Sequence, residues 1–120
     1  MTIYLVEDSP AVCERFLREF CSIPNVEVVG VASEAVEAIA GIGRTQPHVV
    51  VLDLNLSQGS GMDVLRAVES WSPRPLIWVV SNLEDPVTRV LVSRAGADCF
   101  FDKSTELDAL VDAVTQYASG

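Results

Sequence analysis

The sequence predicts a doubly wound α/β fold: a five-stranded parallel sheet in the order 2-1-3-4-5, flanked by five helices. Two observations carry this prediction. Short apolar runs alternate with helical patterns, so that the 120 residues read as five successive β-α units. The apolar runs are also near-continuous instead of alternating with polar residues, as expected when helices cover both faces of a parallel sheet. In this strand order, the first and third strands are neighbours at the point where the connections reverse.

The first half of the chain contains three helix-start signals. The first strand, Ile3–Asp8, is followed by Ser9–Pro10, a capping residue with proline at the first helical position. Ser33 and Ser60 are predicted to cap the second and third helices, and Val49–Asp53 is the predicted strand between them. Each of these strands is therefore followed by a helix, which can form the crossover that parallel pairing requires.

The second half repeats this organisation. The fourth strand is Leu76–Ser81, and Asp85–Pro86 is predicted to start the fourth helix, which Gly96 ends. The fifth strand is Cys99–Lys103, and Thr105 is predicted to cap the last helix. That helix has an apolar stripe at helical spacing, formed by Leu107, Leu110, Val111, Val114 and Tyr117.

Length and charge limit the possible functions. Residues 1–120 fit a single domain that buries about two-thirds of its unfolded surface. The formal net charge of −9 opposes direct binding to nucleic acid, which depends on Lys and Arg neutralising phosphates, so protein partners are expected. No apolar run approaches the ~18 residues that span a bilayer, and a cytoplasmic location without membrane contact is expected.

Four of the five predicted strands end on a side chain that can bind a metal ion or a phosphoryl group. Glu7 and Asp8 end the first strand, Asp53 the third, Ser81 the fourth and Lys103 the fifth. Open α/β sheets bind their ligands at the carboxyl ends of the strands. These five residues are therefore expected to share one crevice. Lys103 is also the only lysine in the chain.

The charges of this crevice favour a cation. Three carboxylates face one ammonium group, and two like charges 4 Å apart repel by about 4 kcal/mol at an effective dielectric near 20. Carboxylates so crowded take up protons or bind a cation. Oxygen ligands around an open site favour Mg²⁺, which keeps coordination positions free for phosphate oxygens.

The order and spacing of these residues resemble the receiver domain of two-component response regulators, which has a flavodoxin-like fold. The resemblance covers essentially the whole chain. Glu7 and Asp8 resemble the acidic pair of the family, Asp53 its phosphoacceptor, Ser81 its conserved Ser/Thr and Lys103 its lysine. The resemblance implies that Mg²⁺ is the cofactor, bound directly by Asp8 and Asp53 and through water by Glu7.

Four further positions match the family. Phe100, three residues before Lys103, corresponds to the switch aromatic, and Gly61 corresponds to the loop glycine. Asn55 holds the position whose backbone carbonyl joins the metal shell in the family. Leu83, two residues after Ser81, corresponds to a position that tunes the lifetime of the phosphoryl group.

The resemblance implies a phosphoacceptor domain of a phosphorelay. Asp53 would receive a phosphoryl group from a sensor histidine kinase or a phosphotransfer protein. Ser81 and Phe100 would then switch the face formed by the fourth helix, the fifth strand and the fifth helix toward a downstream protein effector. Such a domain catalyses its own phosphorylation and dephosphorylation, but it is not an enzyme with a separate substrate.

Two positions depart from the family pattern. Ser57 stands where many receivers have proline four residues after the phosphoacceptor. Ser104 follows Lys103 where the family usually has proline after a cis peptide bond. A cis bond before a residue other than proline costs about 2.5 to 4 kcal/mol. Either the site holds such a bond or the turn after Lys103 differs.

Two alternative functions remain at this point. A phosphatase resembling haloacid dehalogenases also uses a strand-end Asp, a Ser/Thr, a Lys and Mg²⁺. It usually has a second Asp two residues after the nucleophile, where this chain has Asn55, and its further acidic residues come late in the chain. The other alternative is a receiver-like interaction module whose switching no longer depends on phosphate. The complete set of five site residues argues against it, and the two missing prolines keep it open.

Overall fold

The computed structural model describes residues 1–82 and 86–120. The strands are β1 (Thr2–Val6), β2 (Glu27–Ala32), β3 (Val49–Leu52), β4 (Leu76–Ser81) and β5 (Cys99–Asp102). The helices are α1 (Pro10–Cys21), α2 (Ala35–Thr45), α3 (Gly61–Val68), α4 (Pro86–Arg94) and α5 (Leu107–Ser119). Leu83, predicted to tune the phosphoryl lifetime, and Asp85, predicted to start the fourth helix, lie outside the described residues. None of the helices within the described ranges is long and apolar enough to cross a bilayer.

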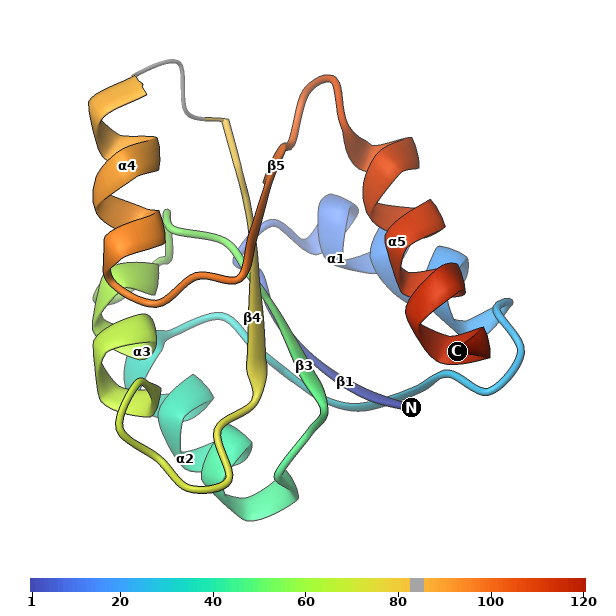
Figure 1. The fold of residues 1–120 in the computed structure, drawn as a ribbon, viewed down its shortest axis with the longest axis horizontal. Helices are drawn as coiled ribbons and strands as arrows, with labels where there is room; N and C mark the ends of the chain where they lie inside the picture. Colours follow the sequence, from blue (N-terminus) through green and yellow to red (C-terminus); the bar gives the residue numbers. More distant parts are fainter. Residues whose placement is uncertain (83–85) are drawn as a thin grey trace.

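The sheet has the predicted topology. Its strands are all parallel and lie in the order β2-β1-β3-β4-β5. Figure 1 shows α1 and α5 on one side of the sheet and α2, α3 and α4 on the other. The predicted doubly wound fold is therefore confirmed, with β1 and β3 adjacent in the middle of the sheet.

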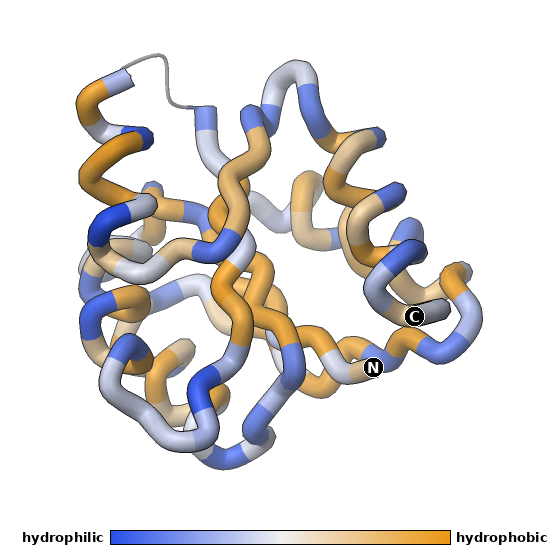
Figure 2. The backbone as a smooth tube through the Cα atoms, viewed as in Figure 1, coloured by the Kyte–Doolittle hydropathy of each residue, from blue (hydrophilic) through white to orange (hydrophobic). Residues whose placement is uncertain are grey.

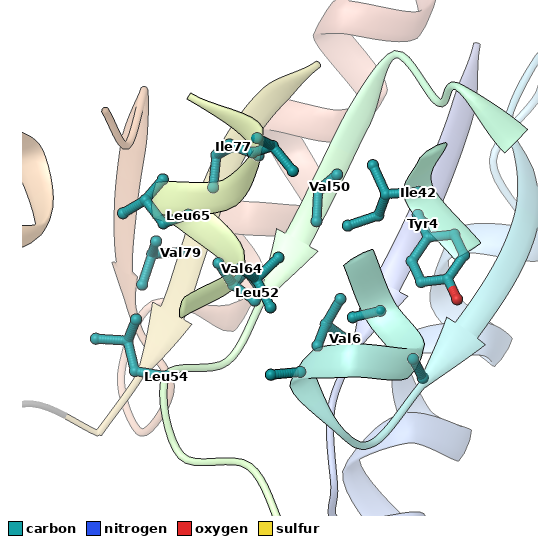
Figure 3. Close-up of a cluster of buried hydrophobic side chains, with 14 of the residues drawn as sticks. Tyr4, Val6, Ile42, Val50, Leu52, Leu54, Val64, Leu65, Ile77 and Val79 are labelled. Carbon is teal, nitrogen blue, oxygen red and sulfur yellow. The ribbon is translucent and has the colours of Figure 1, made fainter. Parts of the chain in front are cut away.

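The sheet is buried on both faces, which explains its continuous apolar runs. In β3, Val50 and Leu52 pack into the core beneath α2 and α3, whereas Val49 and Val51 pack into the core beneath α1 and α5. Successive strand side chains point to opposite faces, so a strand covered on both sides needs an apolar residue at every position. The hydrophobic colour of the central strands in Figure 2 follows this burial. The core on the α2 and α3 side is shown in Figure 3.

Two of the predicted helix caps are confirmed. The Ser9 hydroxyl accepts a hydrogen bond from the Val12 N–H at 3.4 Å, and Pro10 is the first residue of α1. Ser60 forms a reciprocal capping box with Asp63 at the start of α3. Each cap satisfies backbone donors that the first turn of a helix leaves without a partner.

The predicted caps at Ser33 and Thr105 are wrong. Helix α2 begins after Glu34, and the Ala35 N–H donates instead to the Gln58 carbonyl, 3.0 Å away in the loop that follows β3. Helix α5 begins after Glu106, because the chain first makes a turn closed by hydrogen bonds to the Asp102 carbonyl. At α2 a backbone carbonyl thus satisfies a donor of the first helical turn, and at α5 an additional turn precedes the helix and moves its start past Thr105.

Two glycines of α2 provide a matched test of this packing. The Tyr4 ring is buried against Gly41, where an added Cβ would lie 2.6 Å from Cζ of the ring. At Gly43 the nearest atom to an added Cβ is 3.5 Å away, on the edge of the Trp71 ring. Alanine in place of a helical glycine gains about 1 kcal/mol where space allows, whereas overpacking a core costs about 1 to 3 kcal/mol.

We therefore expect Gly43→Ala to raise the free energy of unfolding and Gly41→Ala to lower it, as measured by urea denaturation. Both residues belong to the same helix, so a difference in helix propensity does not separate them. Equal stabilisation by the two substitutions would show that the Tyr4 ring is not held against α2.

Candidate functional site

The last backbone hydrogen bonds at the carboxyl ends of the strands position the predicted site residues. The Glu7 N–H donates to the Ala32 carbonyl of β2 at 3.0 Å, and the Asp53 N–H donates to the Val6 carbonyl of β1 at 2.9 Å. The Lys103 N–H donates to the carbonyl of Ser81, the last residue of β4, at 3.2 Å. These backbone bonds place the residues that follow β1, β3 and β5 at the carboxyl edge of the sheet, as the sequence predicted.

The Lys103 ammonium group lies between two acidic side chains. Its Nζ is 2.6 Å from Glu7 Oε1 and 3.0 Å from Asp53 Oδ2. The contact with Asp53 is a hydrogen bond, and that with Glu7 is a close ion pair. The Glu7 and Asp53 side chains are only 1% and 4% exposed, and that of Lys103 is 14% exposed. The ammonium group of Lys103 is therefore paired with two buried carboxylates.

The other oxygens of these carboxylates accept backbone hydrogen bonds. Glu7 Oε2 accepts from the Ser9 N–H at 3.0 Å, and Asp53 Oδ1 accepts from the Asn55 N–H at 3.1 Å. Ser9 was recognised in the sequence only as a helix cap. Its second role, orienting Glu7 through the backbone, leaves no signal in residue type because any residue except proline supplies an N–H.

Burial and charge shift two pKa values in the site. Burial raises the pKa of Glu7, as does the charge of Asp53, while contact with Lys103 and the Ser9 N–H oppose the rise. Burial alone would lower the pKa of Lys103, but its contacts with Glu7 and Asp53 outweigh burial and raise it. The two shifts therefore have different causes: burial dominates at Glu7, and the two carboxylates dominate at Lys103. Lys103 gains two anionic neighbours, whereas Glu7 gains only part of one cation.

Three carboxylates converge beside this lysine. Oxygen atoms of Glu7, Asp8 and Asp53 all lie within 4.8 Å of one another, and Asp8 is exposed while the other two are buried. Oxygen donors with an open side are the ligands that Mg²⁺ prefers. The donor set therefore fits a divalent cation.

Gly61 brings the start of α3 close to the loop after Asp53. Its N–H donates to the Leu54 carbonyl at 3.0 Å. A Cβ at this position would lie 2.7 Å from the Leu54 Cα and would also overlap the Asp53 carbonyl. Only glycine leaves room for the start of α3 to pack this closely against the backbone of Asp53 and Leu54. This contact fixes the position of α3 next to the loop that carries Asp53.

Ser81 and Phe100 lie on one face of the sheet. Phe100 packs with Val79 in the core covered by α4, and Ser81, two residues after Val79 in β4, points to that same face. Ser81 is fully buried, and its Oγ has no hydrogen-bond partner in the part of the chain that the structure describes. A buried hydroxyl without a partner costs free energy, typically about 1 to 3 kcal/mol.

Arg89 of α4 covers the Phe100 ring. The centre of its guanidinium group lies 4.6 Å from the ring centroid, and its Nη2 donates to the Phe100 carbonyl at 3.4 Å. The same Nη2 lies 3.8 Å from Glu106 Oε1. Sequence reasoning missed these contacts because they join residues of different elements, and an exposed helical arginine has no pattern that reveals its partner.

The whole chain is similar to response regulators. Residues 3–115 match the family described as the response regulator receiver domain. A nitrate/nitrite response regulator homologue of Haemophilus influenzae is 32% identical over 100% of the chain and 58% of its own length. The nitrate/nitrite response regulator NarL of Escherichia coli is 31% identical over 99% of the chain and 55% of its own length. The chain thus spans little more than half of these relatives.

A solved structure agrees with these similarities. The two-component response regulator of the LuxR family from Aurantimonas superimposes with a TM-score of 0.88 at 29% identity, covering 99% of this chain and 85% of that one. The family match spans nearly the entire sequence, and the strand order is the one expected of a flavodoxin-like receiver fold. This chain belongs to the receiver domain family of two-component response regulators.

Proposed function

We propose that residues 1–120 form the phosphoacceptor domain of a phosphorelay and that Asp53 accepts the phosphoryl group. The placement of Lys103 carries this proposal, because its ammonium group lies against Asp53 in a crevice with excess negative charge. The donor is a phosphohistidine on a sensor histidine kinase or a phosphotransfer protein. Such transfer takes place in the cytoplasm, where we place the domain.

Each side chain has a distinct role in the transfer. Asp53 attacks in line, so that its oxygen bonds to phosphorus as the bond to the donor nitrogen breaks and the imidazole leaves with the electron pair. Lys103, already within 3.0 Å of Asp53, holds an oxygen of the incoming group. Water later attacks the phosphorus, which releases inorganic phosphate and restores the Asp53 carboxylate.

Glu7, Asp8 and Asp53 would hold Mg²⁺, together with the backbone carbonyl of Asn55. When bound, the ion offsets the negative charge of the incoming phosphoryl group. The Asn55 N–H already bonds to Asp53, so its backbone lies beside the acceptor. Glu7 stays tied to the Ser9 N–H, which keeps its carboxylate beside the other two.

The buried Ser81 hydroxyl supports a switch. Because its Oγ has no partner within residues 1–82 and 86–120, it gains a hydrogen bond when it turns toward an oxygen of phosphorylated Asp53. Phe100, on the same face of the sheet, then moves into the space beside β4, which alters the surface of α4, β5 and α5. A downstream protein partner that binds one state better than the other reads this change.

The acceptor assignment predicts the mass of the protein after phosphorylation. With acetyl phosphate and Mg²⁺, the chain should gain one phosphoryl group, as measured by intact-mass spectrometry, and EDTA should abolish the gain. Asp53→Asn and Asp8→Asn should remain unlabelled, the first for want of the nucleophile and the second for want of a metal ligand. Asp112→Asn, an exposed site on α5, is the matched control and should label normally.

Labelling of Asp53→Asn at the native rate would place the acceptor elsewhere. A native chain that is never labelled would favour a phosphate-independent interaction module, whereas sustained turnover of phosphomonoesters would favour a phosphatase.

The switch predicts where backbone exchange changes. Beryllium fluoride, which mimics the phosphoryl group on Asp53, should alter hydrogen exchange in α4 and β5 of the native chain. Ser81→Ala should still be labelled at Asp53 but should show a smaller exchange change, because the hydroxyl that couples the two events is missing. Exchange changes confined to α1, or unaltered by Ser81→Ala, would contradict the proposed coupling.

A further inference from the structure

The turn after Lys103 differs from the one its family position suggests. The Lys103–Ser104 peptide is trans, because Ser72–Pro73 is the one cis bond over residues 1–82 and 86–120. Even so, the Lys103 side chain reaches both Glu7 and Asp53. Some other feature must therefore hold the backbone of Lys103 in place.

The two neighbours of Lys103 are bonded to each other across it. Asp102 Oδ1 accepts hydrogen bonds from the Ser104 N–H at 2.8 Å and from the Ser104 hydroxyl at 2.6 Å. This is an Asx-type turn, in which the carboxylate replaces the carbonyl of an ordinary backbone turn. These hydrogen bonds also lower the pKa of Asp102, so the group stays ionised and remains a strong acceptor.

The backbone N–H and carbonyl of Asp102 are hydrogen-bonded to residues just before α5. Its N–H donates to Glu106 Oε1 at 2.9 Å, and its carbonyl accepts from the N–H groups of Thr105 at 3.3 Å and Glu106 at 2.8 Å. On the other side, the Lys103 N–H is bonded to the Ser81 carbonyl. The Lys103 backbone is thus fixed between β4 and the first turn of α5.

We propose that Asp102 and Ser104 are positioning residues that hold the Lys103 backbone so that its ammonium group reaches Glu7 and Asp53. The turn stands where the family usually has a cis bond between the lysine and a proline. The inference deepens the proposed function and rests on it only for its kinetic consequence. The placement of the lysine itself is a property of the unphosphorylated chain.

The first readout measures this placement without phosphorylation. The chain has two alkyl amines, Lys103 and the exposed N-terminal amine of Met1, which bonds to the Asn25 carbonyl far from the site. Limiting acetic anhydride in EDTA acetylates both amines, and mass spectrometry of peptides gives the rate of Lys103 relative to that of the N-terminus. A buried, paired ammonium group reacts slowly, so displacement of Lys103 raises this ratio.

Asp102→Ala should raise the acetylation ratio several-fold and slow phosphoryl uptake by roughly 10- to 100-fold, since misplacement of about 1 Å at a reaction site can cost about 100-fold. Asp102→Asn keeps an oxygen that accepts from Ser104 and should restore both values. Ser104→Ala, which loses only the hydroxyl bond, should show smaller changes in the same direction, and Ser104→Thr should match the native chain.

The result that overturns the proposal is an Asp102→Ala variant with native acetylation and native uptake. Equal impairment of Asp102→Ala and Asp102→Asn would also overturn it, because the negative charge and not the turn would then matter. If the native chain takes up no phosphoryl group, the proposed function is contradicted. The acetylation ratios of the variants then still test whether Asp102 and Ser104 position Lys103.

Discussion

A single ammonium group balances two buried carboxylates at the carboxyl edge of the sheet. Lys103 Nζ lies 2.6 Å from Glu7 and 3.0 Å from Asp53, in a crevice that Asp8 makes still more acidic. Removing one partner from a buried ion pair typically costs about 3 to 5 kcal/mol, because a charge is left without compensation. The chemistry proposed for Asp53 depends on this contact, and we propose that the tight turn after β5 maintains it.

The sheet makes the contact possible by bringing distant parts of the chain together. Glu7 and Asp53 follow the adjacent central strands β1 and β3, while Lys103 follows the edge strand β5 and reaches across the end of β4. Its backbone bond to the Ser81 carbonyl also joins the lysine to the proposed switch residue. The crevice is therefore sensitive to the relative positions of β4 and β5, the two strands nearest the face that we expect to change.

Much of this arrangement could be predicted from the sequence. Strands buried on both faces leave continuous apolar runs, so the fold and the meeting of Glu7, Asp8, Asp53 and Lys103 followed from strand ends alone. The caps at Ser33 and Thr105 were predicted wrongly because backbone carbonyls of Gln58 and Asp102 satisfy the donors of α2 and the turn before α5. The contacts of Arg89 with Phe100 could not be predicted, since they depend on how α4 packs against β5. The sequence showed that Ser104 breaks the family pattern, but only the structure reveals the turn with Asp102 that replaces it.

A double-mutant cycle on Lys103 and Glu7 tests the central claim most directly, with the free energy of unfolding measured by urea denaturation in EDTA at neutral pH. Lys103→Met alone should destabilise the chain, because Glu7 and Asp53 are then buried without their cation. Adding Glu7→Gln should recover part of this loss, giving a coupling energy of about 1 to 3 kcal/mol between the two positions. Additive effects of the two substitutions would contradict this prediction and show that Lys103 and Glu7 do not share a buried ion pair.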